Sequence, residues 1–337
     1  MWIVAVDSGK YQTKAIAGNN EVEAKRFSLL TKMTPTTEKQ SLSPSSYVTK
    51  LNNEKFLVGS QQGFHDFETT KAKDLHRRTT YTAISQLVPN KAEIVLAIGC
   101  PLTQYTNTEL RNEYMRFMLN LPEGDKTNPN KAEVEISFEV NDKKFTYTVK
   151  RLLVFPETSG FLIKYEELFE RKTVAIIDIG GLNVNGAVYR RLEPNEDKFF
   201  TINKGGNVFK QQLRKELNSS FSNLNLNEDD MEDIILDGYV EINDVEDSVR
   251  KTKEIIDKHK FEFLDQIKQE MRSYSWSVNT YQFIFVGGGS ILFEKEIREQ
   301  PEFGKRLIIS ENAVWDNCEG FGMAAGLEIP VEELVLS

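Results

Sequence analysis

The sequence predicts an α/β protein with two lobes, and three observations lead to this fold class. The chain has 337 residues, more than a single ordinary hydrophobic core accommodates. Short β-branched runs, typical of buried strands, alternate with segments whose apolar residues recur at helical spacing. Three of these runs lead directly into loops of Gly and small polar residues, where open α/β sheets bind their ligands.

The predicted elements follow from these patterns. Helices are expected where apolar residues repeat at helical spacing, as at Phe209, Leu213 and Leu217, and over residues 247–273. We also expect a late helix of small residues at 316–326 and a strand-like patch at 234–240 within a peripheral acidic segment. The runs expected to be strands are residues 2–6, 94–98, 134–138, 145–149, 152–155, 174–177 and 283–286.

The expected division is an N-terminal lobe of residues 1–165, with a small insert at about 30–60, and a C-terminal lobe of residues 166–337, with a small insert at about 206–270. A strand followed by Asp and then Gly occurs twice, at Asp7 and at Asp178. A duplicated domain leaves such a repeat, although chance also produces one.

Composition and charge narrow the functional classes. The net charge of −9 repels polyanions, so we expect no direct binding to DNA. The strongest basic cluster, Lys71, Lys73, Arg77 and Arg78, is expected to be a solvated face of a helix or loop. No apolar run approaches the roughly 20 residues that span a bilayer, and the N-terminus lacks the basic start of a signal peptide. We therefore expect a cytoplasmic protein with no membrane partner.

The cysteines and histidines are few and scattered. Cys100 and Cys318 stand far apart in apolar surroundings, so we expect them to be reduced and buried. With so few potential ligands, neither a disulfide framework nor a zinc site is expected.

The first predicted strand ends in Asp7-Ser8-Gly9-Lys10, which has the residue types that a triphosphate requires. The backbone N–H groups of a Gly-containing turn and a lysine bind phosphate oxygens. Mg²⁺ takes one or two carboxylates, usually through water. A β-turn between two hairpin strands explains the segment equally well, and the spacing of a Walker A loop is absent.

Two further segments place a carboxylate after an apolar run. Asp178, followed by Gly180 and Gly181, repeats the pattern of Asp7, a carboxylate followed by a glycine turn after a predicted strand. It offers a second carboxylate for Mg²⁺, and a plain turn is the alternative. Glu157 follows the run at 152–155 and opens a predicted helix. Its carboxylate is suited to polarising water, and the alternative is an acidic residue that stabilises a helix N-terminus.

A fourth segment, Gly287-Gly288-Gly289-Ser290, follows the last predicted strand. Backbone without side chains lies close against a base or an α-phosphate, and a flexible turn is the alternative. The spacing is not Gly-x-Gly-x-x-Gly, so a dinucleotide-binding fold is disfavoured.

In order and spacing, these segments resemble the superfamily of actin, sugar kinases and heat-shock chaperone ATPases, and within it the ParM-type plasmid-segregation actins of bacteria. The resemblance implies an actin-like fold, a duplicated ribonuclease H-like domain with two lobes around a nucleotide cleft. The segments that carry it are residues 7–13, 98–105, 154–160, 178–183, 205–210, 285–290 and 312–326, of which 98–105 and 312–326 point to the ParM type.

The resemblance also implies roles for single residues. Glu157 and Asp178 would be catalytic, and Asp7 and Asp178 would hold Mg²⁺ through water. Gln211 would lie near the ribose and base, together with Gly206 and Lys210. The residues implied to bind ATP (or GTP) are Ser8, Gly9, Lys10, Gln12, Gly180, Gly181, Leu182, Asn183, Gly205, Gly206, Lys210, Gly287, Gly288, Gly289 and Ser290.

The second phosphate motif departs from the family's pattern. Leu182 and Asn183 replace two threonines, and Asn185 stands where an Asp is usual. Hydroxyl contacts to the γ-phosphate are therefore in doubt, hydrolysis is expected to be slower than in relatives, and binding without turnover stays open.

The function implied by the resemblance is that of an ATPase that forms filaments with itself on binding ATP and Mg²⁺. Such a filament segregates plasmid DNA through a DNA-binding adaptor of the ParR type. A non-filamentous small-molecule kinase of the same fold is the main alternative, although no zinc cluster or Asp-rich substrate loop near 98–105 supports it. A chaperone ATPase is the third hypothesis and would need an attached substrate domain.

Overall fold

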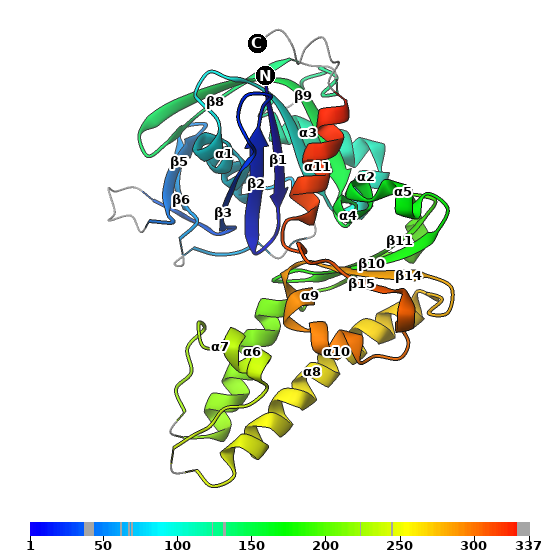
Figure 1. The fold of residues 1–337 in the computed structure, drawn as a ribbon. Helices are drawn as coiled ribbons and strands as arrows, with labels where there is room; N and C mark the ends of the chain where they lie inside the picture. Colours follow the sequence, from blue (N-terminus) through cyan, green and yellow to red (C-terminus); the bar gives the residue numbers. More distant parts are fainter. Residues whose placement is uncertain are drawn as a thin grey trace. The chain divides into compact units, whose positions relative to one another are not determined.

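The computed structural model describes residues 1–36, 44–60, 63–66, 68, 70–122, 124–130, 133–222, 224–243 and 245–328. They form two units, one of Met1–Glu166 with the segment from Trp315, and one of Glu167–Val314. Each unit has its own sheet (Figure 1). The expected division had placed the segment from Trp315 with the second lobe, whereas the structure places it with the first, where its helix packs against β1.

The first unit contains a nine-stranded sheet in the order β3-β2-β1-β7-β9-β8-β5-β6-β4. β1 pairs with β7, and β7 with β9, in parallel, whereas β1 pairs with β2 antiparallel. Residues 30–60, expected as an insert, supply β4, β5 and β6 to this sheet. The strands are β1 (Trp2–Ser8), β2 (Gln12–Gly18), β3 (Lys25–Leu30), β4 (Met33–Pro35), β5 (Tyr47–Leu51), β6 (Glu54–Val58), β7 (Glu93–Cys100), β8 (Val134–Val140) and β9 (Lys143–Pro156).

Helices cover both faces of the central strands. Successive side chains of a strand point to opposite faces, so Val4 and Val6 of β1 pack into the core with α1 and α3, while Ala5 packs with α11. The small side chains of Ala5 and Ala97 leave room for Phe321 of α11. The helices of this unit are α1 (Asp74–Leu87), α2 (Leu102–Thr106), α3 (Thr108–Met118), α4 (Gly160–Lys164) and α11 (Asp316–Leu327), the last confirming the predicted helix of small residues. Helix α5 (Glu166–Phe169) begins at the last residue of the segment Met1–Glu166 and continues into the second unit.

Helices α4 and α11 approach each other closely at two glycines. A Cβ atom on Gly160 would lie 2.4 Å from Cα of Asn317, and one on Gly320 would lie 2.2 Å from the carbonyl oxygen of Gly160. Beside this contact, Nζ of Lys164 lies 2.8 Å from Oδ1 of Asp316. The packing of α11 therefore depends on glycine at both positions.

The second unit repeats the strand order of the first. Its sheet runs β12-β11-β10-β14-β15, with β13 also paired to β11. β10 is antiparallel to β11 and parallel to β14, just as β1 is antiparallel to β2 and parallel to β7. This repeat supports the duplication expected from the sequence. The strands are β10 (Thr173–Ile179), β11 (Val184–Arg190), β12 (Glu193–Pro194), β13 (Phe200–Ile202), β14 (Gln282–Val286) and β15 (Leu307–Ile309).

The core of the second unit includes three aromatic rings from different helical segments. Phe209 of α6, Phe263 of α8 and Phe293 have ring centroids 4.6–5.5 Å apart. The predicted helical spacings at 209–217 and 247–273 are thereby confirmed as buried faces of α6 and α8. The helices are α6 (Gly206–Ser220), α7 (Met231–Asp237), α8 (Ser248–Ser273), α9 (Gly288–Leu292) and α10 (Glu294–Arg298), with short 3₁₀ turns at Glu196–Lys198 and Gly304–Arg306.

Two details differ from the sequence prediction. The prediction of a strand at 234–240 is wrong: helix α7 buries Met231 and Ile235, four residues apart, and ends at Asp237, followed by Gly238 in the left-handed conformation. The runs at 145–149 and 152–155 form the single strand β9, in which a bulge shifts the register between Val149 and Arg151.

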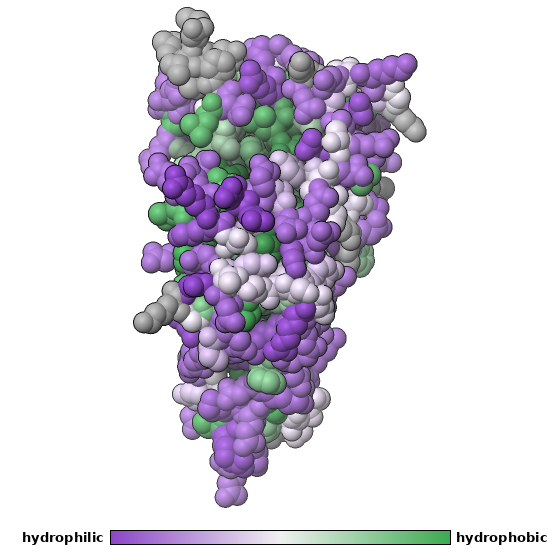
Figure 2. Space-filling model, turned by 90° about the vertical axis from the view of Figure 1, so that its right-hand side faces the viewer, coloured by the Kyte–Doolittle hydropathy of each residue, from purple (hydrophilic) through white to green (hydrophobic). Residues whose placement is uncertain are grey.

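The described helices include none with the length and hydropathy that crossing a bilayer requires. The face shown in Figure 2 is mostly hydrophilic, with smaller hydrophobic areas between. Cys100 and Cys318 are free and buried, as expected.

Candidate functional site

The carboxyl end of β1 places Asp7 beside a tight turn. Asp7 lies opposite Lys14 of β2 in the antiparallel register and is 7% exposed. A Cβ atom on Gly9 would lie 2.8 Å from the carbonyl oxygen of Gln12, so the turn between the strands is built for glycine. The side-chain amide of Gln12 donates to Ser28 Oγ at 3.1 Å, on the exposed side of the hairpin.

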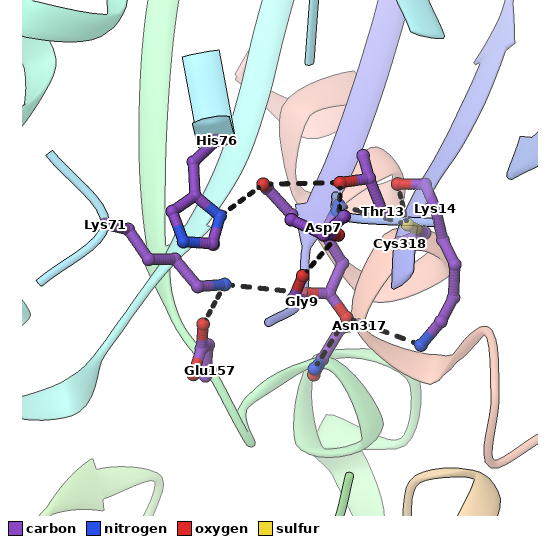
Figure 3. A network of polar contacts seen from close by, with 12 residues as sticks. Asp7, Gly9, Thr13, Lys14, Lys71, His76, Glu157, Asn317 and Cys318 are labelled. Carbon is purple, nitrogen blue, oxygen red and sulfur yellow. Dashed lines mark hydrogen bonds and ion pairs between the residues drawn. The ribbon is translucent and has the colours of Figure 1, made fainter. Parts of the chain in front are cut away.

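Asp7 is held by groups from three parts of the chain (Figure 3). Its carboxylate lies 3.8 Å from Nζ of both Lys14 and Lys71, and Nδ2 of Asn317 donates to it at 3.4 Å. Its backbone N–H donates to Sγ of Cys318 at 3.3 Å, and that thiol in turn donates to the carbonyl of Lys14 at 3.1 Å. Helix α11 thus helps to fix the end of β1.

Lys71 also forms an ion pair with Glu157, just after β9 (Figure 3). The lysine is 1% exposed. Burial acts to lower the pKa of Lys71, but the charges of Glu157 and Asp7 outweigh it, so that the pKa is raised above its ordinary value. The backbone N–H of Glu157 donates to the carbonyl of Cys100 at the end of β7. An ammonium and two carboxylates therefore meet where β1, β7 and β9 end.

Lys10 and Ser8, in the turn after Asp7, have different surroundings. Burial lowers the pKa of Lys10, an effect that the nearby Glu157 partly offsets. Ser8 is 2% exposed, and its hydroxyl contacts Nδ1 of His76 in α1 at 2.8 Å. The Ser8 hydroxyl is thus directed toward α1.

In the second unit, Asp178 lies at the end of β10, opposite Val286 of the parallel strand β14. Gly287 follows with φ of 80° and ψ of 155°, a conformation that is essentially restricted to glycine. A Cβ atom there would lie 2.2 Å from Oδ1 of Asp178. The Asp178 carboxylate therefore lies against bare backbone of the Gly-rich loop.

The turn after Asp178 contacts the start of α6. The backbone N–H groups of Gly206 and Asn207 donate to the carbonyls of Gly180 and Gly181 at 2.9 and 2.8 Å. A Cβ atom on Gly205 would lie 2.4 Å from the Gly180 carbonyl oxygen, so the close approach requires glycine. The second phosphate motif and the predicted ribose-binding segment at the start of α6 are thus in direct backbone contact.

The remaining predicted residues of this unit have local partners. Nδ2 of Asn183 donates to Oδ1 of Asn185 at 3.0 Å, so two of the three residues that depart from the family pattern bond to each other. Leu182 is buried, as is Ser290, whose hydroxyl donates to the Gly287 carbonyl at 2.7 Å. Nζ of Lys210 pairs with Glu232 of α7 at 2.8 Å.

The Gly-rich loop packs against β10 at its second half. A Cβ atom on Gly289 would lie 2.2 Å from Cγ2 of Ile179, whereas one on Gly288 would meet Val314 at an ordinary 3.7 Å. The described part of the second unit therefore brings together Asp178, Gly180, Gly181, Gly205, Gly206, Gly287 and Gly289.

The prediction that the basic cluster forms a solvated face is wrong for three of its four residues. Lys71, Arg77 and Arg78 are at most 8% exposed, and only Lys73 pairs at the surface, with Glu68. Asp74, at the start of the same helix, pairs with both Arg77 and Arg78, and Arg78 also donates to backbone carbonyls of β5. The partners of Lys71 are distant in sequence. The cluster therefore stabilises the first unit.

The sequence reasoning also assigned no site role to Lys71, Lys14, His76, Asn317 or Cys318, which the structure places around Asp7 and Ser8. The closest signal was the position of Asn317 and Cys318 in a segment that the resemblance had singled out. For His76 and Lys71, the local sequence gave no such signal.

Comparisons with known proteins agree with this architecture. Residues 5–160 match the family model described as the actin like proteins N terminal domain. The Alp12 filament structure is 25% identical over 97% of this chain and 98% of its own, with a TM-score of 0.68. A 15-stranded ParM filament from Clostridium botulinum is 14% identical over 97% and 99%, with a TM-score of 0.68.

The archaeal actin homolog Ta0583 in complex with ADP is 16% identical over 97% of this chain and 100% of its own, with a TM-score of 0.70. No curated protein sequence matches the chain significantly.

The repeated strand order, the match of residues 5–160 and the similar solved structures show that the chain has an actin-like fold. The resemblance to the ParM-type bacterial actins, which the sequence indicated, is confirmed at the level of the fold, which the chain shares with the filament structures of Alp12 and ParM.

Proposed function

We propose that this protein binds and hydrolyses ATP (or GTP) with Mg²⁺ and that it forms filaments with copies of itself. The observation that carries the proposal is the meeting of Asp7, Lys71 and Glu157 beside a glycine turn at the ends of three strands. The ADP complex of Ta0583, an actin homolog with the same fold, supports nucleotide as the ligand.

The residues at the end of β1 fit a magnesium nucleotide in chemical type. The described residues include no group of three or more His, Cys, Asp or Glu side chains that would hold a metal ion by themselves. Mg²⁺ bound to nucleotide is held mostly by phosphate oxygens and water, with one or two carboxylates. Asp7 and Asp178 suit this role, and the bound ion would neutralise phosphate charge.

Glu157 is the residue proposed to orient and accept a proton from the attacking water. Its ion pair with Lys71 holds the carboxylate in place at the end of β9, within the part of the unit where the phosphates are proposed to bind. Lys10, with its pKa lowered by burial, adds positive charge near the phosphates. The backbone of Ser8 and Gly9 contributes N–H donors, as phosphate-binding turns do.

In the second unit, the turn of Gly180, Gly181, Leu182 and Asn183 is proposed to bind phosphate through backbone N–H groups. The start of α6, at Gly205 and Gly206, and the loop Gly287–Ser290 are proposed to contact ribose and base, since their bare backbone allows close approach. Lys210 is proposed to contact the same part of the nucleotide, in competition with its ion pair to Glu232. Gln12 is proposed to add a polar contact from β2.

The cellular role that we propose is plasmid segregation in the cytoplasm through a DNA-binding adaptor of the ParR type. The Alp12 and ParM filament structures support self-assembly as the mechanical part of this role. The net charge of −9 supports an adaptor in place of direct DNA contact.

The test uses the purified full chain with ATP and Mg²⁺. We expect saturable nucleotide binding, phosphate release, and light scattering that rises above a critical protein concentration. Under conditions where the variant is folded, Glu157→Gln should retain binding and lose roughly 100-fold or more in phosphate release, a typical loss for a general base. Glu135→Gln, at an exposed position of β8, is the control and should match wild type.

Absence of nucleotide binding by the wild type would overturn the proposal. ATP consumption that requires an added metabolite, without scattering, would instead support the small-molecule kinase of the same fold.

A further inference from the structure

A buried polar cluster lies behind the β1–β2 turn in the first unit. It consists of His76 and four hydroxyl residues, Ser8, Thr13, Thr31 and Thr79, none more than 2% exposed. Figure 3 shows His76 reaching from α1 toward the end of β1. Buried polar groups need partners, so the hydrogen bonds of this cluster fix its geometry.

The cluster connects α1 to the backbone of the turn. Oγ of Ser8 lies 2.8 Å from Nδ1 of His76. Oγ1 of Thr13 lies 2.9 Å from the hydroxyls of both Thr79 and Thr31. Thr31 then donates to the carbonyl of Gly9 at 2.6 Å, which completes the path from helix to turn.

The hydroxyl protons of the three threonines each have an acceptor within the cluster or its backbone. The carbonyls only accept, so the proton of Thr31 goes to Gly9 and that of Thr79 goes to the carbonyl of His76 at 3.1 Å. The proton of Thr13 serves Thr79. Ser8 is the hydroxyl whose bonding depends on which imidazole nitrogen carries the proton.

Three facts favour the proton on Nδ1. Among the described residues, Nε2 of His76 has no hydrogen-bond partner. A buried N–H without an acceptor is the rarer and costlier case, so the unpartnered nitrogen is better left as a lone pair. Burial, and then the positive charges of Lys71 and Lys10, lower the pKa of this ring, so it is neutral and carries a single proton to place.

We propose that His76 is a positioning residue for the first phosphate-binding turn: its neutral Nδ1–H donates to Ser8 Oγ and thereby holds the turn at Gly9 in its binding conformation. The inference rests on the proposed function, because the turn is taken as a nucleotide site. His76 itself touches neither nucleotide nor metal in this role. It acts through Ser8, whose hydroxyl is then free to donate toward Thr13 at 3.4 Å.

The variants distinguish the two ring nitrogens. The amide of His76→Asn is placed near Nδ1, and the amide of His76→Gln near Nε2, whereas His76→Leu has neither. We expect His76→Leu and His76→Gln to weaken binding of a fluorescent ATP analogue about tenfold, the value of roughly one buried hydrogen bond. His76→Asn should stay within about threefold of wild type, because it restores the donor to Ser8.

Tyr81→Phe is the matched control for a purely structural effect. It also removes one buried hydrogen bond of α1, from the Tyr81 hydroxyl to the carbonyl of Met118 at 2.7 Å. We expect it to lower the unfolding temperature about as much as His76→Leu but to leave nucleotide affinity unchanged. Equal affinity loss in both variants would overturn the positioning role.

A second measurement does not depend on nucleotide. The chain has three histidines, so ¹⁵N NMR of the ring nitrogens, assigned with His65→Gln and His259→Gln, resolves His76. We expect a neutral ring with a pyrrole-type Nδ1 at pH 7. A proton on Nε2 overturns the inference even if the protein binds nucleotide, whereas failure of wild type to bind nucleotide, with Nδ1–H observed, refutes the proposed function alone.

Discussion

Lys71 and Glu157 form an ion pair in the interior of the first unit, although one precedes α1 and the other follows β9. Such a pair is costly to bury and costlier to break, because removing one partner leaves the other charge uncompensated. Asp7, 3.8 Å from the same ammonium, adds a second carboxylate that depends on it. The pair therefore links the stability of the unit to the arrangement of its acids.

Lys71→Met should lower the free energy of unfolding of the first unit by about 3–5 kcal/mol, the usual cost of breaking a buried ion pair. Lys73→Met is the control two residues away, because its pair with Glu68 is exposed, and we expect its unfolding temperature to match wild type. Urea unfolding of both variants measures the difference. Equal stability of Lys71→Met and wild type contradicts the buried pair.

Gly320→Ala should destabilise the packing of α11 on α4. Its Cβ would lie 2.2 Å from the backbone oxygen of Gly160, and overpacking of this kind costs about 1–3 kcal/mol. Gly322→Ala on the same helix meets only the Ala5 side chain, at 3.5 Å, and should gain up to about 1 kcal/mol from helix propensity. Thermal unfolding separates the two, and a stabilised Gly320→Ala protein would rule out the close contact.

Gly287→Ala should disturb the position of Asp178. The backbone conformation at Gly287 is essentially restricted to glycine, with a strain of about 1–3 kcal/mol for other residues, and the new Cβ would overlap the Asp178 carboxylate. Gly288→Ala is the neighbouring control, since its Cβ would have ordinary contacts. We expect only Gly287→Ala to lower the unfolding temperature, and the reverse order would refute the geometry.

The buried His76 should make stability depend on pH. Burial, then Lys71 and Lys10, lower its pKa well below the ordinary 6.5. Below about pH 6.5, His76 binds a proton in the unfolded chain but stays neutral in the folded protein. The free energy of unfolding therefore decreases as the pH falls, by up to about 1.4 kcal/mol per pH unit. Above that pH the contribution is fully present.

Urea unfolding at pH 7 and pH 5.5 measures this dependence. His76→Asn should lose less stability on acidification than wild type, because it has no imidazole to protonate. Tyr81→Phe retains His76 and should follow the wild-type slope. Parallel curves for His76→Asn and wild type would contradict the assignment.

The buried strands were predictable because strands covered on both faces appear as continuous apolar runs, as at β1, β7, β10 and β14. The long helix α8 was predictable from its periodic apolar face. The strand-like patch at α7 was misassigned, since a short apolar run fits either element and only burial of Met231 and Ile235 on one face decides.

The site was only partly predictable. Carboxylates and glycines at strand ends have local sequence signals, so Asp7, Gly9 and Asp178 were identified. The role of Lys71 depends on partners brought together by three strands, and local sequence shows only a lysine in a basic cluster. The same holds for His76, whose partner Ser8 belongs to another element.

The contacts of α11 with the end of β1 also have a consequence for synthesis. Asn317 and Cys318, which bond to Asp7, are translated long after the strand that they hold in place. A nascent chain therefore carries an unfinished Asp7 environment until α11 has left the ribosome, and domains generally fold as units once complete. The order of residues along the chain thus delays a competent first motif until α11 has been made.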